Sequence, residues 1–115
     1  MTTEGDQVLS VYVTAADAEE ARRIGRALVE ENLAACVNIL PGHTAIYRWE
    51  GKVEEGAECA FLAKTTAGRF DALRARVRAL HSYDLPCIVA FPAEAGDPEF
   101  LDWVRAGVVP QRAPP

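Results

Sequence analysis

Residues 33 to 52 constrain the fold of this chain more than any other stretch. An apolar run there reaches Pro41-Gly42, and a second run of β-forming residues follows it to Glu50-Gly51. Proline lacks the N–H that a β-ladder needs, and a dipeptide ending in glycine suits the tight turn of a hairpin. The stretch therefore predicts two consecutive strands and a hairpin tip.

Helix signals flank this stretch on both sides. Asp17 followed by Glu20 has the spacing of a helix cap and its reciprocal partner, and Asn32 offers a left-handed stop. Either Thr65 or Thr66 is a candidate cap for a second helix. We expect strands at 8–14, 33–40, 58–64 and 88–91, a hairpin at 43–52 and a break at 54–56. We expect helices from about 18 to 31, from the Thr65 or Thr66 cap to an end no later than Leu85-Pro86, and from the Asp97 cap to Gly107.

The order of these elements predicts an α+β fold of the ferredoxin-like split β-α-β type, with an extended β-hairpin and a C-terminal helix. A length of 115 residues suits one domain, which we expect at 8–107, between a flexible N-terminus at 1–7 and a proline-rich tail at 108–115. Helices on one sheet face leave the other face open, although its strands carry apolar residues. Monomers rarely expose such a patch, so we expect closed self-association.

Charge and composition exclude several partners. The net charge of −5 repels phosphate groups, so neither nucleic acid nor an anionic membrane is an expected partner. No apolar run approaches the roughly 20 residues of a membrane span. The first seven residues lack the features of a signal peptide, and three widely spaced cysteines suit reduced thiols, so we expect a cytoplasmic protein.

Three side chains are metal-ligand candidates by their chemistry: Cys36, His81 and Cys87. Thiolate and imidazole are the ligands that copper and zinc take from proteins. For two of them a purely structural role is also open. Cys36 also suits a small buried apolar residue within a strand, and His81 also suits a hydrogen bond to a carbonyl at a helix end.

A second set suits a cleft or an interface: Tyr47, Trp49, Glu50, Lys64 and Tyr83. Aromatic walls with a fixed charge can orient a small ligand, and Tyr and Trp equally serve as anchors between subunits. Glu50 belongs to an acidic patch with Glu54, Glu55 and Glu58, which could hold cations or could simply be solvated. No glycine-rich phosphate loop, nucleophile elbow or paired metalloprotease histidine motif is present, so an enzyme is not expected.

The chain resembles the CutA family of divalent-cation tolerance proteins over about residues 8–106. The matching segments are Glu31 to Asn38, Pro41-Gly42, Tyr47 to Lys52, Glu58 to Thr65, His81 to Pro86 and Leu101 to Trp103. The resemblance implies a cytoplasmic homotrimer, similar in architecture to the PII signalling proteins, that binds copper or another divalent metal, with no organic cofactor. Ser82 and Cys87 depart from the family pattern, which usually has proline and glutamate there, and a thiol at residue 87 favours a soft metal.

Three functions remain open at this point. The first is a homotrimer that binds copper or another divalent or soft metal in the response to metal ions. The second is a PII-like regulatory trimer that binds a small ligand or a partner protein at clefts between subunits. The third is a structural scaffold without a ligand.

Overall fold

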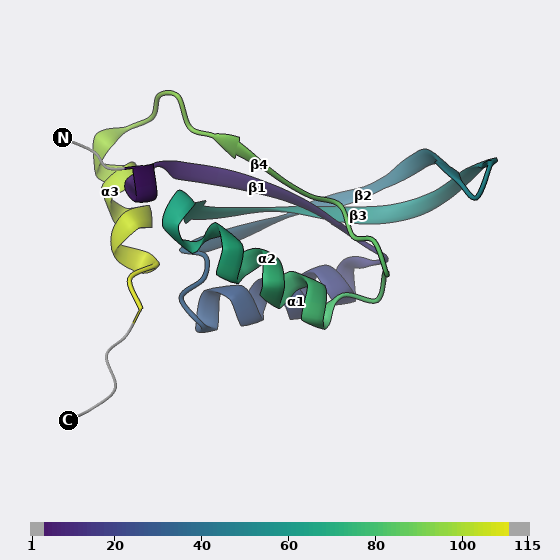
Figure 1. Cartoon of the computed structure of the whole chain (residues 1–115), viewed down its shortest axis with the longest axis horizontal. Helices are drawn as coiled ribbons and strands as arrows, with labels where there is room; N and C mark the ends of the chain where they lie inside the picture. The colour runs from purple at the N-terminus through teal and green to yellow at the C-terminus, as the bar shows by residue number, and fades with distance from the viewer. Residues whose placement is uncertain (1–3, 111–115) are drawn as a thin grey trace.

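The computed structural model of this chain describes residues 4–110 (Figure 1). These residues form four strands and three α-helices, and single turns of 3-10 helix cover Glu4–Asp6 and Ala67–Arg69. In chain order the elements are β1 (Val8–Ala15), α1 (Ala18–Glu30), β2 (Cys36–Trp49), β3 (Lys52–Thr66), α2 (Phe70–Leu80), β4 (Ile88–Pro92) and α3 (Pro98–Gly107).

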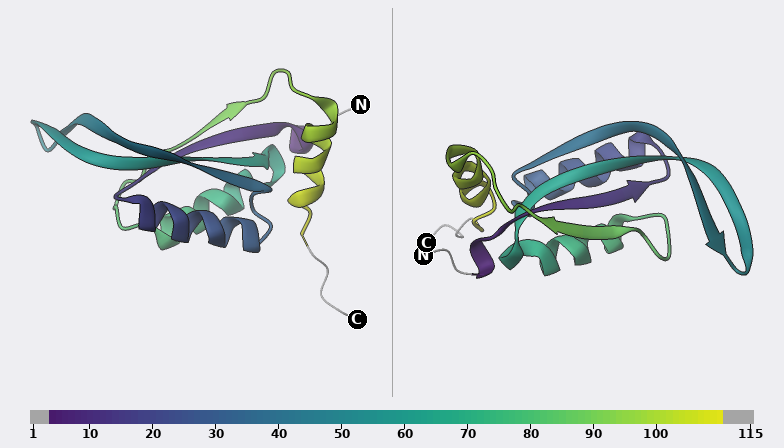
Figure 2. Two further views of the ribbon diagram at one scale, coloured as in Figure 1. Left: turned by 180° about the vertical axis from the view of Figure 1, so that it is seen from behind. Right: turned by 90° about the horizontal axis from the view of Figure 1, so that it is seen from above.

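The four strands form one antiparallel sheet in the order β2-β3-β1-β4. Helices α1 and α2 lie side by side on one face of this sheet, and α3 stands at the end farthest from the hairpin arm (Figure 2). We define the arm as the part of the β2–β3 hairpin beyond Leu40 and Glu58. The ferredoxin-like plan with an extended hairpin and a C-terminal helix is confirmed.

Helix boundaries follow the capping signals at α1 and α3. The Asp17 carboxylate accepts from the N–H of Glu20 at 2.8 Å, and the Asp97 carboxylate accepts from the N–H of Phe100 at 3.1 Å. Asn32 has a φ of 57°, the left-handed geometry expected after α1. These local signals therefore set where two of the helices begin and where one ends.

The expected threonine cap of α2 is wrong. The Thr65 hydroxyl donates to the carbonyl of Leu33 at 2.7 Å, and the Thr66 side chain makes no cap hydrogen bond. A tertiary contact across 32 residues thus takes the hydroxyl that a cap would use. The helix itself starts at Phe70, after the 3-10 turn, and ends at Leu80, well before Leu85-Pro86.

The expected strand breaks are also wrong, because β2 and β3 each run without interruption from the core to the arm tip. Pro41-Gly42 lies in a β-bulge between Leu40 and His43, and a bulge tolerates proline because its residues need not donate to the ladder. Gly56 pairs with Ala45 within the ladder. The tight turn at Glu50-Gly51 is confirmed, with φ values of 50° and 80°.

A close-packed core lies between the sheet and the two helices. Its fully buried side chains include Phe61 of β3, Ile24 and Leu28 of α1, and Leu73 and Val77 of α2. On β3, Phe61 and its neighbours two residues apart face the helices, because side chains alternate along a strand. The intervening residues of β3 face the open side of the sheet.

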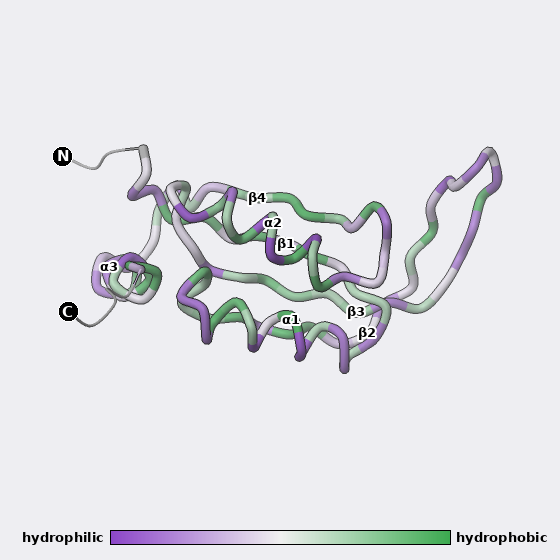
Figure 3. Tube along the Cα trace, turned by 60° about the horizontal axis from the view of Figure 1, so that its bottom comes forward, coloured by the Kyte–Doolittle hydropathy of each residue, from purple (hydrophilic) through white to green (hydrophobic). Residues whose placement is uncertain are grey.

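The open face carries apolar side chains, as predicted. Val89 and Phe91 of β4 are 46% and 55% exposed, and most of the β4 trace is hydrophobic (Figure 3). Their neighbours Ile88 and Ala90 instead pack against the core. Val89 and Phe91 therefore leave apolar surface at one edge of the sheet, on the face opposite the helices.

Chain ends fall partly beyond the described residues. The expected flexible N-terminus at 1–7 includes residues 1–3, and the expected tail at 108–115 includes residues 111–115, which lie outside the described range. Glu4–Asp6 forms a 3-10 turn, and Val108 is 3% exposed. No helix within residues 4–110 is long and apolar enough to cross a membrane.

Leu28→Ala should lower the free energy of unfolding by about 2–5 kcal/mol, since it leaves a cavity against the sheet. Val29→Ala, one position along the same helix, should change it by less than about 0.5 kcal/mol, because Val29 is 39% exposed. Denaturant unfolding of both variants at one protein concentration measures the difference. Equal losses would contradict the described packing of α1.

Candidate functional site

An open pocket of about 500 Å³ lies where the arm leaves the sheet. One wall belongs to β2, and the opposite wall belongs to the loop between α2 and β4. The lining residues are Thr14, Ala45, Tyr47, Arg48, Trp49, Glu58, Tyr83, Asp84, Leu85 and Cys87. Aromatic, acidic and thiol groups from four segments of the chain therefore meet at one place.

The β-ladder sets the arm wall. Ala45, Tyr47 and Trp49 share one face of β2, because side chains two residues apart point the same way. Their partners across the ladder are Gly56, Glu54 and Lys52. Tyr47 and Trp49 are each about half exposed, so their rings are accessible from the pocket.

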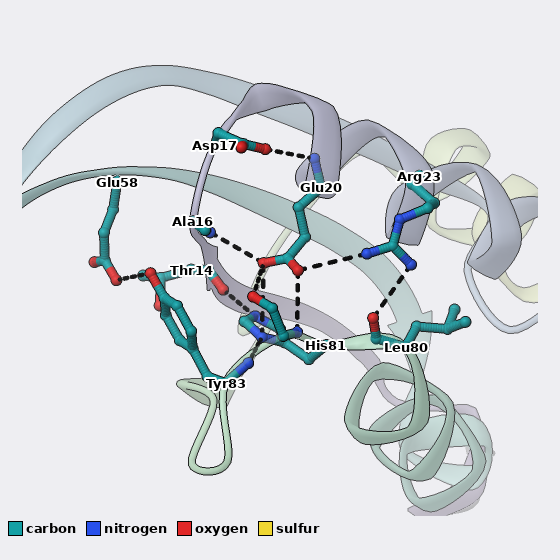
Figure 4. A network of polar contacts seen from close by, with 10 residues as sticks. Thr14, Ala16, Asp17, Glu20, Arg23, Glu58, Leu80, His81 and Tyr83 are labelled. Atoms are coloured by element: carbon teal, nitrogen blue, oxygen red, sulfur yellow. Dashed lines mark hydrogen bonds and ion pairs between the residues drawn. The ribbon is translucent and has the colours of Figure 1, made fainter.

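The opposite wall depends on a buried carboxylate, that of Glu20 at the first turn of α1 (Figure 4). Glu20 Oε2 accepts from the N–H of Ser82 at 3.0 Å, and Oε1 accepts from the Ser82 hydroxyl at 3.0 Å. The N–H of Ala16 also donates to Oε1 at 3.1 Å. Glu20 thus ties the start of α1 to the loop that follows α2.

Burial raises the pKa of Glu20, but the hydrogen bonds from Ala16 and Ser82 outweigh it, so that the net pKa lies below its ordinary value. A carboxylate with several donors is stabilised in its ionised form. The loop is therefore held by a charged group at neutral pH.

His81 fixes the same loop through its ring, whose side chain is fully buried. Its Nε2 lies 2.7 Å from the carbonyl of Thr14, and its Nδ1 accepts from the N–H of Tyr83 at 3.0 Å. A carbonyl can only accept, so Nε2 carries the proton and the ring is the neutral tautomer. Figure 4 shows both contacts beside Glu20.

Tyr83 reaches from this loop across the pocket. Its hydroxyl donates to Glu58 Oε2 at 2.9 Å, and His43 Nε2 lies 3.4 Å from Glu58 Oε1 (Figure 4 shows the first contact). Burial, together with the hydrogen bond and charge of Glu58, raises the pKa of Tyr83 to about 12. The phenol therefore stays protonated and clamps the loop to the base of the arm.

Cys87 lies in the pocket wall beside Thr14 and Glu58. Burial and the negative charge of Glu58 raise the pKa of the thiol, while a hydrogen bond with the Thr14 side chain acts the other way. The thiol is thus protonated at neutral pH. A soft metal binding there must displace that proton.

The structure brings together some of the predicted site residues and separates others. Tyr47, Trp49, Tyr83 and Cys87 line the pocket. His81 is not in the lining but contacts two lining residues, Thr14 and Tyr83. Glu50 is exposed at the arm tip, away from the pocket lining. All three cysteines are free thiols.

Cys36 and Lys64 pair across the ladder on the open sheet face, and the Lys64 ammonium donates to the Asn38 side chain. Lys64 also pairs with Ser10, four residues along β1 from Thr14, which is roughly 13 Å at the rise of a strand. Cys36 is therefore remote from Cys87. Within residues 4–110, no three His, Cys, Asp or Glu side chains gather closely enough to hold a metal ion.

Nothing in the sequence indicated that Glu20 binds the loop after α2, or that Thr14 contacts His81 and lines the pocket. The spacing from Asp17 predicted that the Glu20 side chain bonds back to the N–H of the cap residue. This reciprocal bond is wrong, because the Glu20 carboxylate accepts from the N–H of Ala16 and from Ser82, which is 62 residues away. Glu58 was visible only as part of an acidic patch. What singles it out is its position at the base of the arm, which depends on the ladder register.

Glu20→Gln should lower stability at pH 7, because the charged acceptor of two Ser82 donors is lost. The folded pKa of Glu20 is lowered, so its contribution is complete above the unfolded pKa of about 4.5 and disappears as the pH falls through the folded pKa. Urea unfolding from pH 7 to pH 3 should show the two proteins converging toward acid. Glu19→Gln, at an exposed neighbouring position, is the control, and a pH-independent gap would contradict this role.

Comparison with known proteins gives one consistent family. Residues 9–107 match the model of the CutA1 divalent ion tolerance protein. The divalent-cation tolerance protein CutA of Thermus thermophilus is 55% identical over 95 residues, which cover 83% of this chain and 92% of that protein. A solved structure from that organism, described as divalent cation tolerance protein (Cut A1), superposes with a TM-score of 0.87 at 51% identity, over 89% of this chain and 99% of that chain.

A second solved structure agrees. CutA1 from Oryza sativa has a TM-score of 0.88 at 37% identity, over 93% of this chain and 98% of that chain. Both the sequence match and the two superpositions span nearly the whole described fold, including the arm and the loop that carries the pocket. The chain therefore belongs to the CutA1 family of divalent ion tolerance proteins.

Proposed function

We propose that this protein is a homotrimer that binds copper or another divalent or soft metal ion and acts in cellular tolerance of such metals. The observation that carries the proposal is the pocket at the base of the arm, whose lining includes Cys87, Glu58 and Asp84. Thiol and carboxylate groups are metal donors. Membership of the divalent ion tolerance family supports the same class of ligand.

Cys87 is the donor that selects among metals. A thiolate favours copper(I) or zinc over calcium and magnesium. The described part of one chain does not gather three donors, so further ligands come from another copy or from solvent. Cys36 and His81 stay predicted ligands, and for His81 a metal must replace one of its two ring hydrogen bonds.

Assembly is supported by exposed apolar side chains on the open face and on the arm. Val89 and Phe91 lie on that face, while Ile46 and Val53 of the arm are 67% and 64% exposed. The outer edges of the sheet, β2 and β4, have no strand partner within the described chain. A closed ring of copies covers both kinds of surface.

A second candidate function is favoured by the aromatic lining. Tyr47, Trp49 and Tyr83 beside the Glu58 carboxylate form the kind of wall that orients a small organic ligand, in an opening of suitable size. On this proposal the trimer is a non-catalytic regulatory module of the PII type. A cytoplasmic location, without nucleic acid or membrane as partner, remains a prediction for both candidates.

Cys87→Ser should weaken copper(I) binding by at least about tenfold, since even second-shell partners of a metal contribute that much. Binding is measured on the reduced protein by competition with a chromogenic copper(I) chelator. The wild-type affinity should rise with pH across the neutral range, because the raised pKa of Cys87 keeps the thiol protonated. Cys59→Ser, which removes a thiol packed against the core, is the control.

An unchanged affinity in Cys87→Ser would remove the pocket from the metal proposal. If Cys36→Ser alone abolished binding, the metal site would lie on the open sheet face instead. A pH-independent affinity would show that no protonated thiol is displaced.

Native mass spectrometry should give three times the chain mass of 12.5 kDa at micromolar concentration. Introducing charge on the open face with Val89→Glu and Phe91→Glu should shift the mass to that of the monomer, because the carboxylates would be buried without partners. Val109→Glu, at a position 61% exposed and outside that face, should leave the trimer intact. A wild-type monomer would contradict the assembly.

A further inference from the structure

The pocket is larger than a metal ion requires. Its volume of about 500 Å³ lies within the range of roughly 300–1,000 Å³ typical of sites for small organic molecules. Fewer than three metal donors gather anywhere in residues 4–110. The volume therefore leaves room for an organic ligand.

Three aromatic rings border the opening. Tyr47 and Trp49 stand on one face of the arm, and Tyr83 comes from the opposite loop. Tyr47 lies near enough to Tyr83 to contribute to its raised pKa. The face of an aromatic ring carries partial negative charge, so a pocket bordered by three rings suits an organic cation.

The charges of the wall favour the same ligand. Glu58 and Asp84 are the acids of the lining, and Arg48 is its one basic residue. Strand alternation directs the Arg48 side chain to the face of β2 opposite Tyr47 and Trp49. The phenol of Tyr83 and the thiol of Cys87 are neutral at pH 7. Lys52 and Glu54, the ladder partners of Trp49 and Tyr47, lie on the same face and offset each other in formal charge. The carboxylates of Glu58 and Asp84 therefore leave this side with a net negative charge.

We propose that this pocket binds a small organic ammonium ion, a quaternary or methylated amine, with its charge over the rings of Tyr47, Trp49 and Tyr83 and near the carboxylates of Glu58 and Asp84. The proposal deepens the second candidate function and rests on it. Desolvated cation–π contacts are worth about 2 kcal/mol, so a neutral ligand of the same shape should bind more weakly by a factor of ten or more.

Choline and 3,3-dimethylbutan-1-ol test this, since they differ at the centre of the head group by nitrogen in place of carbon. Trp49 fluorescence reports the titration in a Trp103→Phe background, at constant ionic strength, and calorimetry repeats it on the unsubstituted chain. Choline should give a saturable change, and the neutral alcohol should bind at least about tenfold more weakly. Equal affinities, or no saturation by choline, would overturn the proposal.

Substitutions locate the binding. Tyr47→Leu keeps apolar volume but removes one ring, and should weaken choline binding at least about fivefold. Phe100→Leu, which replaces a 44% exposed ring on α3 away from the pocket, is the control and should have no effect. Equal behaviour of the two variants would place the binding elsewhere and refute the assignment.

Copper(I) titration of the same sample separates this inference from the proposed functions. Copper binding that depends on Cys87, without choline binding, would reject the ammonium proposal and leave the metal proposal standing. Equal binding of choline and its neutral counterpart would keep a small-ligand pocket but reject the ammonium class. Absence of all three interactions would reject both the pocket functions and this inference.

Discussion

The pairing of β2 with β3 is the constraint on which the rest of the structure depends. The ladder runs from Cys36–Lys64 in the core to Trp49–Lys52 at the arm tip, with one bulge between Leu40 and His43. Its inner half buries Phe61 against the helices. Its outer half carries Tyr47 and Trp49, which line the pocket. Core packing and the pocket lining therefore depend on one register.

Glu58 lies where these two halves meet, and Tyr83 connects it to the buried polar network around Glu20 and His81. Tyr83 reaches Glu58 from a loop whose position is set by Glu20 and His81 on the far side of the sheet. Buried polar groups of this kind require nearly every partner to be satisfied. These hydrogen bonds therefore hold the loop between α2 and β4 in one position beside the arm.

Local signals predicted much of the fold. The Asp17 and Asp97 caps, the Asn32 stop, the Glu50-Gly51 turn and the apolar periodicity all act within a few residues, and each was confirmed. The failures were tertiary. The Thr65 hydroxyl donates to the carbonyl of Leu33 instead of capping a helix. Pro41-Gly42 lies in a β-bulge, so β2 continues through it. Likewise, the sequence indicated Tyr47, Trp49, Tyr83 and Cys87, but only the fold showed that they share a pocket while Cys36 and Lys64 lie elsewhere.

We propose that cations bind at the base of the arm. A crystal structure of the reduced protein soaked with copper(I), with anomalous data, tests this proposal. We expect an anomalous peak within bonding distance of Cys87 Sγ and beside Glu58. A peak at Cys36 on the open sheet face, with none in the pocket, would contradict it.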